Sequence, residues 1–258
     1  MKAVPVSREA HAKKRVLPLV SFHSARAMAV ISLFGGEVLR AAHEFPVLLA
    51  ATAEGFFPAA LTGIKAGTNV FVGPDGRWLA GYVPAMFRRA PFLLARVEDR
   101  DDWVLCLDET SERLSETEGE PLFEPGGGNA DILTRATNLL VQLEQNRRAT
   151  LEAGDLLNRL GLLTPWRPPG GEGEDDFNGL FQVNEPKFQT LSGADLVALR
   201  DIGGLAMIYA QIFSMERLNL MQRLEASRAE AARQRAASEQ TTDLDRLFGI
   251  VDDEPFQF

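Results

Sequence analysis

A turn signal between two apolar runs is the strongest constraint that this sequence places on its fold. Residues 69–72 and 78–83 are largely apolar, and the tetrad Gly-Pro-Asp-Gly at 73–76 lies between them. Proline presets one backbone dihedral, aspartate bonds its own backbone, and glycine accepts a positive φ. The tetrad therefore predicts a β-hairpin, and with it an antiparallel sheet.

Other apolar runs of strand length lie on both sides of this turn, at residues 46–50, 60–64, 91–97 and 103–107. Their close spacing is typical of antiparallel strands joined by short connections. We therefore expect five or six strands in the first half of the chain, arranged as a meander or partial barrel. Residues 37–43 are predicted to form a short helix that leads into this sheet.

The second half of the chain has apolar residues at helical spacing instead. It predicts two successive helices at 129–143 and 150–160, a short strand at 180–183, and a further helix that begins at Gly203 or Gly204 and keeps one apolar face to Leu224. Three prolines and three glycines make residues 165–176 a loop. The sequence thus predicts the α+β class, with the sheet in the N-terminal half, helices in the C-terminal half, and an exposed C-terminal helix and tail.

The chain is expected to hold one domain, at residues 1–224. Residues 225–242 are predicted to be a solvent-exposed helical extension, because alanines are their only apolar residues. Residues 243–258 mix acidic and apolar side chains, which suits either a segment that docks on a partner or on its own domain, or a flexible solubilising end. The docking candidates in this tail are Leu247, Phe248, Phe256 and Phe258.

Composition and charge argue against several classes of function. The chain has 27 basic and 36 acidic side chains and a net charge of -9, so no nucleic-acid partner is expected. One cysteine and three histidines cannot supply a zinc site of ordinary spacing, and neither a metal nor a cofactor is expected. No apolar stretch is long enough for a transmembrane segment. A cytoplasmic location is the default expectation, with export through a signal outside the N-terminus as the alternative.

Two adjacent arginines are the most specific chemical feature. Arg88 and Arg89 lie at a turn flanked by aromatic residues, where they can clamp an anion or pair with the excess acids of the chain. The internal pair is the favoured interpretation, and Glu37 and Asp108 are the candidate carboxylates. Cys106, in a predicted strand, is expected to be a buried structural thiol rather than a nucleophile.

Several segments of the chain match, in order, the pattern of a known family. They are Glu-Phe-Pro-Val at 44–47, Asn-Val-Phe-Val at 69–72, Tyr-Val-Pro-Ala at 82–85, Arg-Arg-Ala-Pro-Phe at 88–92, Gly-Leu-Phe-Gln-Val-Asn-Glu at 179–185 and Ile-Tyr-Ala-Gln-Ile-Phe-Ser at 208–214. Together they resemble the SapC family of bacterial proteins over roughly residues 15–224. Family members tend to carry histidine where this sequence has Gln211.

The resemblance implies an association with a paracrystalline surface layer, from which the family takes its name. Relatives are often encoded near tryptophan-halogenase-like proteins and outer-membrane receptors, and the resemblance carries over no catalytic residue. We therefore predict a non-catalytic binding or accessory protein with a protein partner bound through the tail. The alternatives are an enzyme whose pocket at the sheet edge uses Arg88 and Arg89 with Glu37 or Asp108 as base, and a structural surface-layer component.

Overall fold

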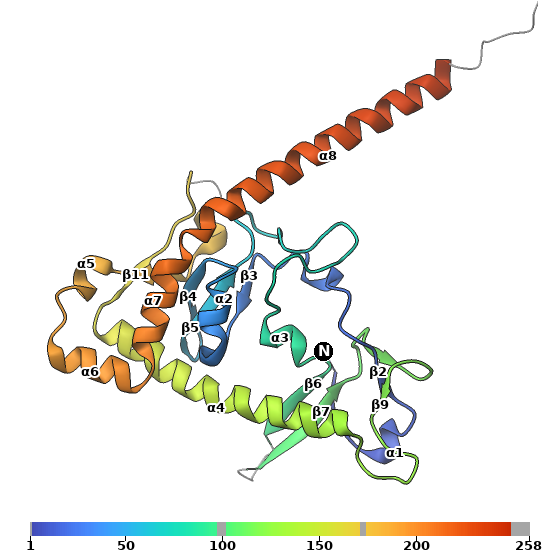
Figure 1. Ribbon diagram of the computed structural model, residues 1–258, viewed down its shortest axis with the longest axis horizontal. Coiled ribbons are helices and arrows are strands. Elements are labelled where there is room, and N and C mark those ends of the chain that lie inside the picture. Colours follow the sequence, from blue (N-terminus) through green and yellow to red (C-terminus); the bar gives the residue numbers. More distant parts are fainter. Residues whose placement is uncertain (1, 97–101, 171–173, 249–258) are drawn as a thin grey trace, which may run out of the picture.

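The strands in the described part of this protein form three antiparallel sheets (Figure 1). The computed structural model describes residues 2–96, 102–170 and 174–248. The largest sheet has the order β10 (Leu163–Pro165), β11 (Leu180–Val183), β4 (Val47–Thr52), β5 (Gly55–Leu61) and β3 (Val30–Ser32). Val47, Leu48 and Leu49 of β4 are all buried. Because neighbouring strand residues point to opposite faces, this sheet is covered on both faces.

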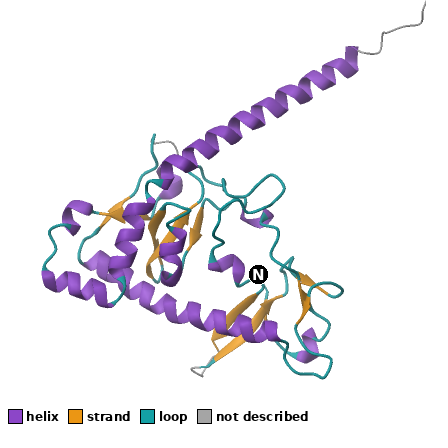
Figure 2. Cartoon of the chain, in the orientation of Figure 1, coloured by secondary structure: helices purple, strands orange, loops and turns teal. Residues whose placement is uncertain are grey.

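The second of the two larger sheets, and a small sheet whose strands have two residues each, contain the remaining described strands. One has the order β1 (Ala3–Pro5), β7 (Trp103–Asp108) and β6 (Phe92–Arg96), and the other the order β8 (Leu114–Ser115), β2 (Arg15–Val16) and β9 (Glu120–Pro121). The α+β class is confirmed, since the sheets come mostly from the N-terminal half and the helices mostly from the C-terminal half (Figure 2). The strands do not form one meander, and no barrel closes among the described residues.

The predicted hairpin at residues 69–83 is correct in its turn and wrong in its strands. Gly76 has a φ of 81°, and the Asp75 carboxylate accepts a hydrogen bond from the backbone N–H of Arg77 at 3.1 Å. A single bridge joins Val72 and Trp78, and no strand forms on either side. The Trp78 ring packs into the core and its Nε1 donates to the carbonyl of Tyr82, so the chain coils over the core instead of extending.

One long helix replaces the two predicted for residues 129–160. Helix α4 (Asp131–Arg159) is unbroken over 29 residues, because residues 144–149 contain neither glycine nor proline to stop it. Its N-terminal half packs against Phe92 and Leu107, whereas its C-terminal half packs against Leu49. Helix α4 therefore joins the two larger sheets, as Figure 1 shows.

The helix predicted from Gly203 to Leu224 is broken after Ser214. Helix α7 (Gly204–Ser214) follows α6 (Gly193–Asp201), and α8 (Arg217–Phe248) follows α7. The Ser214 hydroxyl donates to the carbonyl of Gln211 and accepts a hydrogen bond from the Val47 N–H at 2.8 Å. These bonds fix the end of α7 against β4. The remaining helices are short: α1 (Arg8–His11), α2 (Val38–Ala41), α3 (Ala85–Arg88), α5 (Glu185–Phe188), and the 3-10 turns His23–Ala25, Gly35–Glu37 and Glu174–Phe177.

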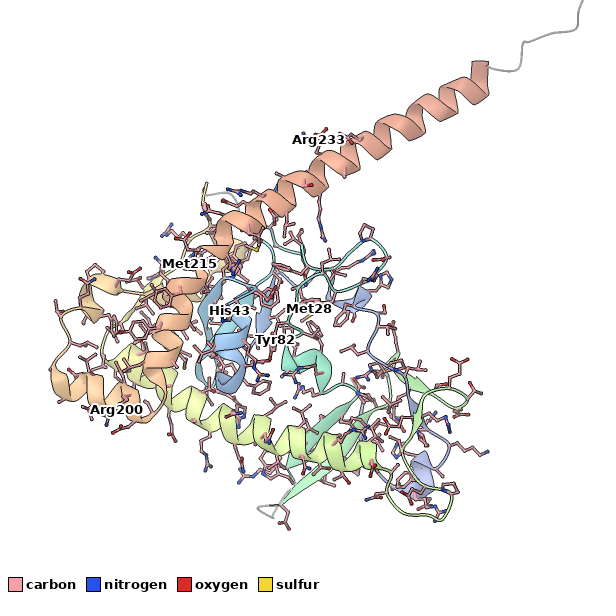
Figure 3. All side chains as sticks on the ribbon, viewed as in Figure 1. Met28, His43, Tyr82, Arg200, Met215 and Arg233 are labelled. Atoms are coloured by element: carbon pink, nitrogen blue, oxygen red, sulfur yellow. The ribbon has the colours of Figure 1, made fainter. Side chains whose placement is uncertain are left out.

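Helix α8 starts on the core and then projects away from it (Figure 1). Met221 is buried, the Glu225 carboxylate accepts the Ile64 N–H at 2.9 Å, and Arg228 donates to the Asn69 carbonyl at 3.1 Å. The helix thus stays attached for one turn beyond the predicted end of its core face. Arg233 lies on the projecting part (Figure 3).

Helix α8 also includes the beginning of the predicted tail. Leu247 and Phe248 lie in its last turn, whereas Phe256 and Phe258 lie outside the described residues. Within the described ranges, no single helix is both long and apolar enough to cross a membrane. One bent pair, α6 with α7, meets that length and composition criterion, with a bend of 93° at the break.

Candidate functional site

Glu37 is a buried carboxylate at the start of α2 that binds three hydrogen-bond donors. Its Oε1 accepts the Phe34 N–H at 2.9 Å, and its Oε2 accepts the Tyr82 hydroxyl at 2.6 Å and the Ala85 N–H at 2.8 Å. Arg88 Nη2 lies 3.6 Å from the same Oε2. The carboxylate therefore ties α2 to α3 and is surrounded by protein donors, an arrangement that suits structural pairing better than proton abstraction from a substrate.

The pKa of the Tyr82 hydroxyl is shifted by its burial and by its contact with Glu37. Burial raises the pKa of Tyr82 to about 12, and the hydrogen bond to Glu37 contributes further, because ionising the phenol would place two negative charges together. Arg88 donates to the Tyr82 hydroxyl at 3.1 Å and to the Val83 carbonyl at 3.0 Å, and its guanidinium lies 5.7 Å from the Tyr82 ring centroid. Arg88 thus belongs to an internal ion pair. Figure 3 shows Tyr82 beside α3.

Asp108 lies apart from this network, at the end of β7 in another sheet. Its carboxylate accepts the backbone N–H of Lys2 at 2.9 Å and the hydroxyl of Thr110 at 2.7 Å. These bonds, that from Lys2 first, hold the pKa of Asp108 below its usual range. Among the described residues, Glu37 is the one of the two candidate carboxylates that contacts an arginine.

Arg89 lies in a different place from its neighbour. It lines a cavity of about 420 Å³ between α4, β5 and β6, and no ion pair or hydrogen bond of its side chain is found among the described residues. Burial alone lowers the pKa of the Arg89 guanidinium. Apolar and polar side chains share the cavity wall. The apolar part comes from Phe34, Phe57, Leu94, Leu140 and Leu143, and the polar part includes Ser32, Thr52, Glu54, Glu144 and Arg147. The structure does not bring Arg88 and Arg89 together into one clamp.

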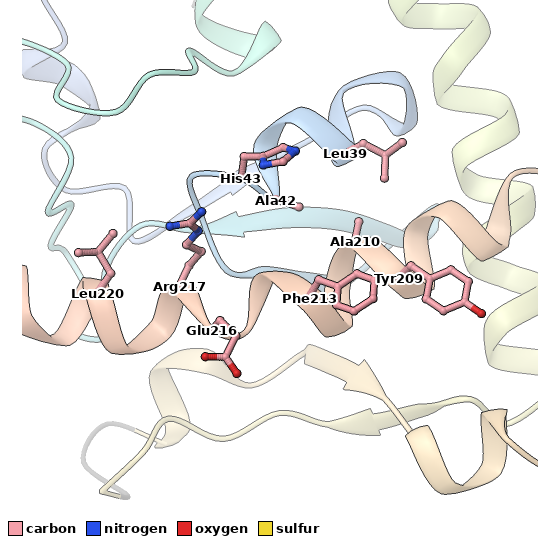
Figure 4. A pocket seen from close by; sticks show the side chains of 9 residues that line it. All are labelled: Leu39, Ala42, His43, Tyr209, Ala210, Phe213, Glu216, Arg217 and Leu220. Atoms are coloured by element: carbon pink, nitrogen blue, oxygen red, sulfur yellow. The ribbon is translucent and has the colours of Figure 1, made fainter.

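A second hollow is a groove of about 450 Å³ between α2 and the α7–α8 junction. Leu39 of α2, Tyr209 and Phe213 of α7 and Leu220 of α8 line it and are 56, 46, 71 and 42% exposed. Figure 4 shows these side chains on the two sides of the groove. The rings of Tyr209 and Phe213 are stacked, with centroids 6.0 Å apart. The groove is not among the sites predicted from the sequence, although the aromatic pair at i and i+4 beside the core face of the helix is a signal for it.

Cys106 and Gln211, the remaining residues considered from the sequence, are buried inside the fold. Cys106 is buried, as expected, and burial raises the pKa of its thiol. Gln211 is buried and its Oε1 accepts the Val183 N–H at 3.0 Å. In the part of the chain that is described, no three His, Cys, Asp or Glu side chains are grouped to hold a metal ion.

Fold and geometry together define an α+β protein whose surface hollows include the Arg89 cavity and, separate from it, an exposed apolar groove. The sequence profile of the SapC family matches residues 6–221, and the chain therefore belongs to the SapC family. No curated protein and no solved structure matches the chain.

Proposed function

We propose that this chain is a non-catalytic accessory protein that binds a protein partner in the groove between α2 and the α7–α8 junction. The observation that carries the proposal is the exposure of Leu39, Tyr209, Phe213 and Leu220 in one hollow. Exposed apolar side chains are normal when scattered, whereas a contiguous group is typical of an interaction site. Aromatic residues are also enriched among those that dominate binding energy.

The charged side chains at the groove indicate the chemistry of the partner. Arg217 is exposed and has no ion pair among the residues that the structure describes. Figure 4 shows it pointing to the side of α8 where His43 lies, whereas Glu216 points to the opposite side. An apolar protein segment that carries an aspartate or glutamate would fill the groove and pair with Arg217. Surface-layer proteins and halogenase-like proteins, which the resemblance to the family suggests, are the first candidates to test as this partner.

A position-specific photo-crosslink tests this proposal. The photoreactive residue p-benzoylphenylalanine is placed at Phe213 of the full chain in living cells. The matched control places it at Val20, which is 69% exposed and lines neither hollow. We expect a discrete crosslinked product at position 213, identified by mass spectrometry, that is absent at position 20. Adding Leu220→Glu should remove this product.

Two results would overturn the proposal. The first is the same pattern of products at both positions, since the groove would then bind nothing in particular. The second is a product with twice the mass of the chain as the main species, which would favour self-association, as in a structural surface-layer component, over an accessory role.

A further inference from the structure

The Arg89 cavity lies where the two larger sheets meet on α4. Phe34 and Phe57 form one wall, with ring centroids 6.0 Å apart, and Leu140 and Leu143 of α4 form another. Its volume of about 420 Å³ lies within the range of small-molecule sites, which are mostly apolar with a few placed polar groups. The cavity is therefore large enough for a ligand and has one charged group free to orient it.

Arg89 is that charged group. Its backbone is fixed, because its N–H donates to the Ala85 carbonyl at 2.9 Å and its carbonyl accepts the Phe92 N–H at 2.8 Å. Two other arginines of this region have acceptors for their guanidinium groups. Arg88 contacts Glu37 and Tyr82, and Arg113 donates to the Leu17 and Ala90 carbonyls. The guanidinium of Arg89 is partly withdrawn from water and has no such acceptor among the described residues. A half-buried guanidinium without a direct hydrogen-bond acceptor is unfavourable, so an anion that enters the cavity and accepts its hydrogen bonds would be stabilised.

The other charges around the cavity limit the anion to a single negative charge. Arg147 donates to Glu54 Oε2 at 2.6 Å and to both carboxylate oxygens of Glu144. This cluster has one more negative than positive charge, so it repels a dianion such as a phosphate monoester more strongly than a monoanion, whose single charge Arg89 can neutralise. A carboxylate matches the guanidinium in charge and geometry.

We propose that this cavity binds an amphipathic monocarboxylate, with the carboxylate on Arg89 and the apolar body between Phe34, Phe57 and the leucines of α4. The site shares no lining residue with the partner groove. Its test is therefore independent of the proposed partner.

Titration calorimetry of the full chain with decanoate tests the proposal, and decan-1-ol is the matched ligand without a charge. We expect decanoate to bind with one site, and decan-1-ol to bind at least about tenfold more weakly, because a hydrogen bond to a charged group is lost. The variant Arg89→Met, which keeps an unbranched apolar stem, should weaken decanoate binding by about 10- to 100-fold.

Two further measurements separate a ligand-binding role of Arg89 from a structural one. The melting temperature of Arg89→Met without ligand should equal or exceed that of the unchanged chain, because a desolvated charge has been removed, and decanoate should no longer raise it. The variant Leu94→Trp, which fills the cavity, should block decanoate with little change in melting temperature.

Three results would overturn the proposal: no decanoate binding at millimolar concentration, equal affinity for decanoate and decan-1-ol, or unchanged decanoate affinity in Arg89→Met. A lower melting temperature of Arg89→Met, together with unchanged affinity, would assign the side chain a structural role instead.

Discussion

At the scale of single residues, adjacent side chains of the same type have separate roles. Arg88 is bound to a buried carboxylate and a tyrosine, whereas Arg89 lines a cavity between two sheets. The sequence identified both arginines and also Glu37, but not which of them meet. The hydrogen bonds of Glu37 with Tyr82 and Ala85 join residues 45 and 48 positions apart, so they depend on how α2 and α3 pack.

The Tyr82 pKa provides a test at this scale. A folded-state pKa near 12, above the usual 10.0, means that the fold favours the protonated phenol. The stabilisation is complete below pH 10 and is lost as the pH rises from about 10 to about 12. Since the chain has two tyrosines, the Tyr209→Phe variant isolates Tyr82. Absorbance at 295 nm should then show ionisation near pH 12.

A second variant gives the control for this titration. Adding Glu37→Gln removes the negative charge next to the phenol and should lower the Tyr82 pKa, but not fully to 10, because burial is the larger cause. A midpoint near pH 10 in the Tyr209→Phe chain, with the fold intact by circular dichroism, would contradict the Glu37–Tyr82 hydrogen bond.

At the scale of elements, α4 determines how the two larger sheets are held together. Its C-terminal half lies close to β5 at Gly154, where an added Cβ would come within 3.0 Å of the Phe56 side chain and closer still to the Phe56 carbonyl. Glycine is a poor helix former, and Gly154 is tolerated there because the strand backbone leaves no space for a side chain.

Gly154→Ala is therefore expected to destabilise the fold. Helix propensity alone predicts a gain of about 1 kcal/mol, but the clash with β5 should outweigh it and give a net loss of about 1–3 kcal/mol. Gly193→Ala at the start of α6, where an added Cβ meets nothing within 4 Å, is the matched control and should be neutral or slightly stabilising. Urea denaturation measures both free energies of unfolding. Equal effects at the two sites would refute the close approach of α4 to β5.

At the scale of the whole molecule, α8 leads the chain away from the groove. Between Leu220 and Phe248 the helix rises by about 42 Å at 1.5 Å per residue. The far end of α8 therefore lies well away from the groove, on the part of the helix that projects from the core (Figure 1).

Two truncations separate attachment of α8 from partner binding. Deleting residues 243–258 should leave the melting temperature unchanged, because the bonds that attach α8 to the core lie at Glu225 and Arg228. Deleting 225–258 removes both bonds and should lower the melting temperature by a few degrees. If the tail docks on the partner, the shorter deletion should also reduce the yield of the crosslink at Phe213. Scanning calorimetry and crosslinking check these outcomes, and an unchanged yield would exclude the tail as a docking element.

The sequence by itself determined the α+β class, the family, the positions of the strands β4, β6, β7 and β11, and the burial of Cys106. These properties follow from local periodicity, from turn residues and from the tendency of apolar runs to be buried. Only the tertiary structure decided that α4 is continuous, that the chain at residues 69–83 coils over the core, and that Arg88 and Arg89 separate. It also placed Leu39 and Phe213 in one groove, and Arg89 and Phe57 in one cavity. The reason is physical: a groove or cavity is formed by packing residues distant in sequence, and local patterns do not encode which elements will meet.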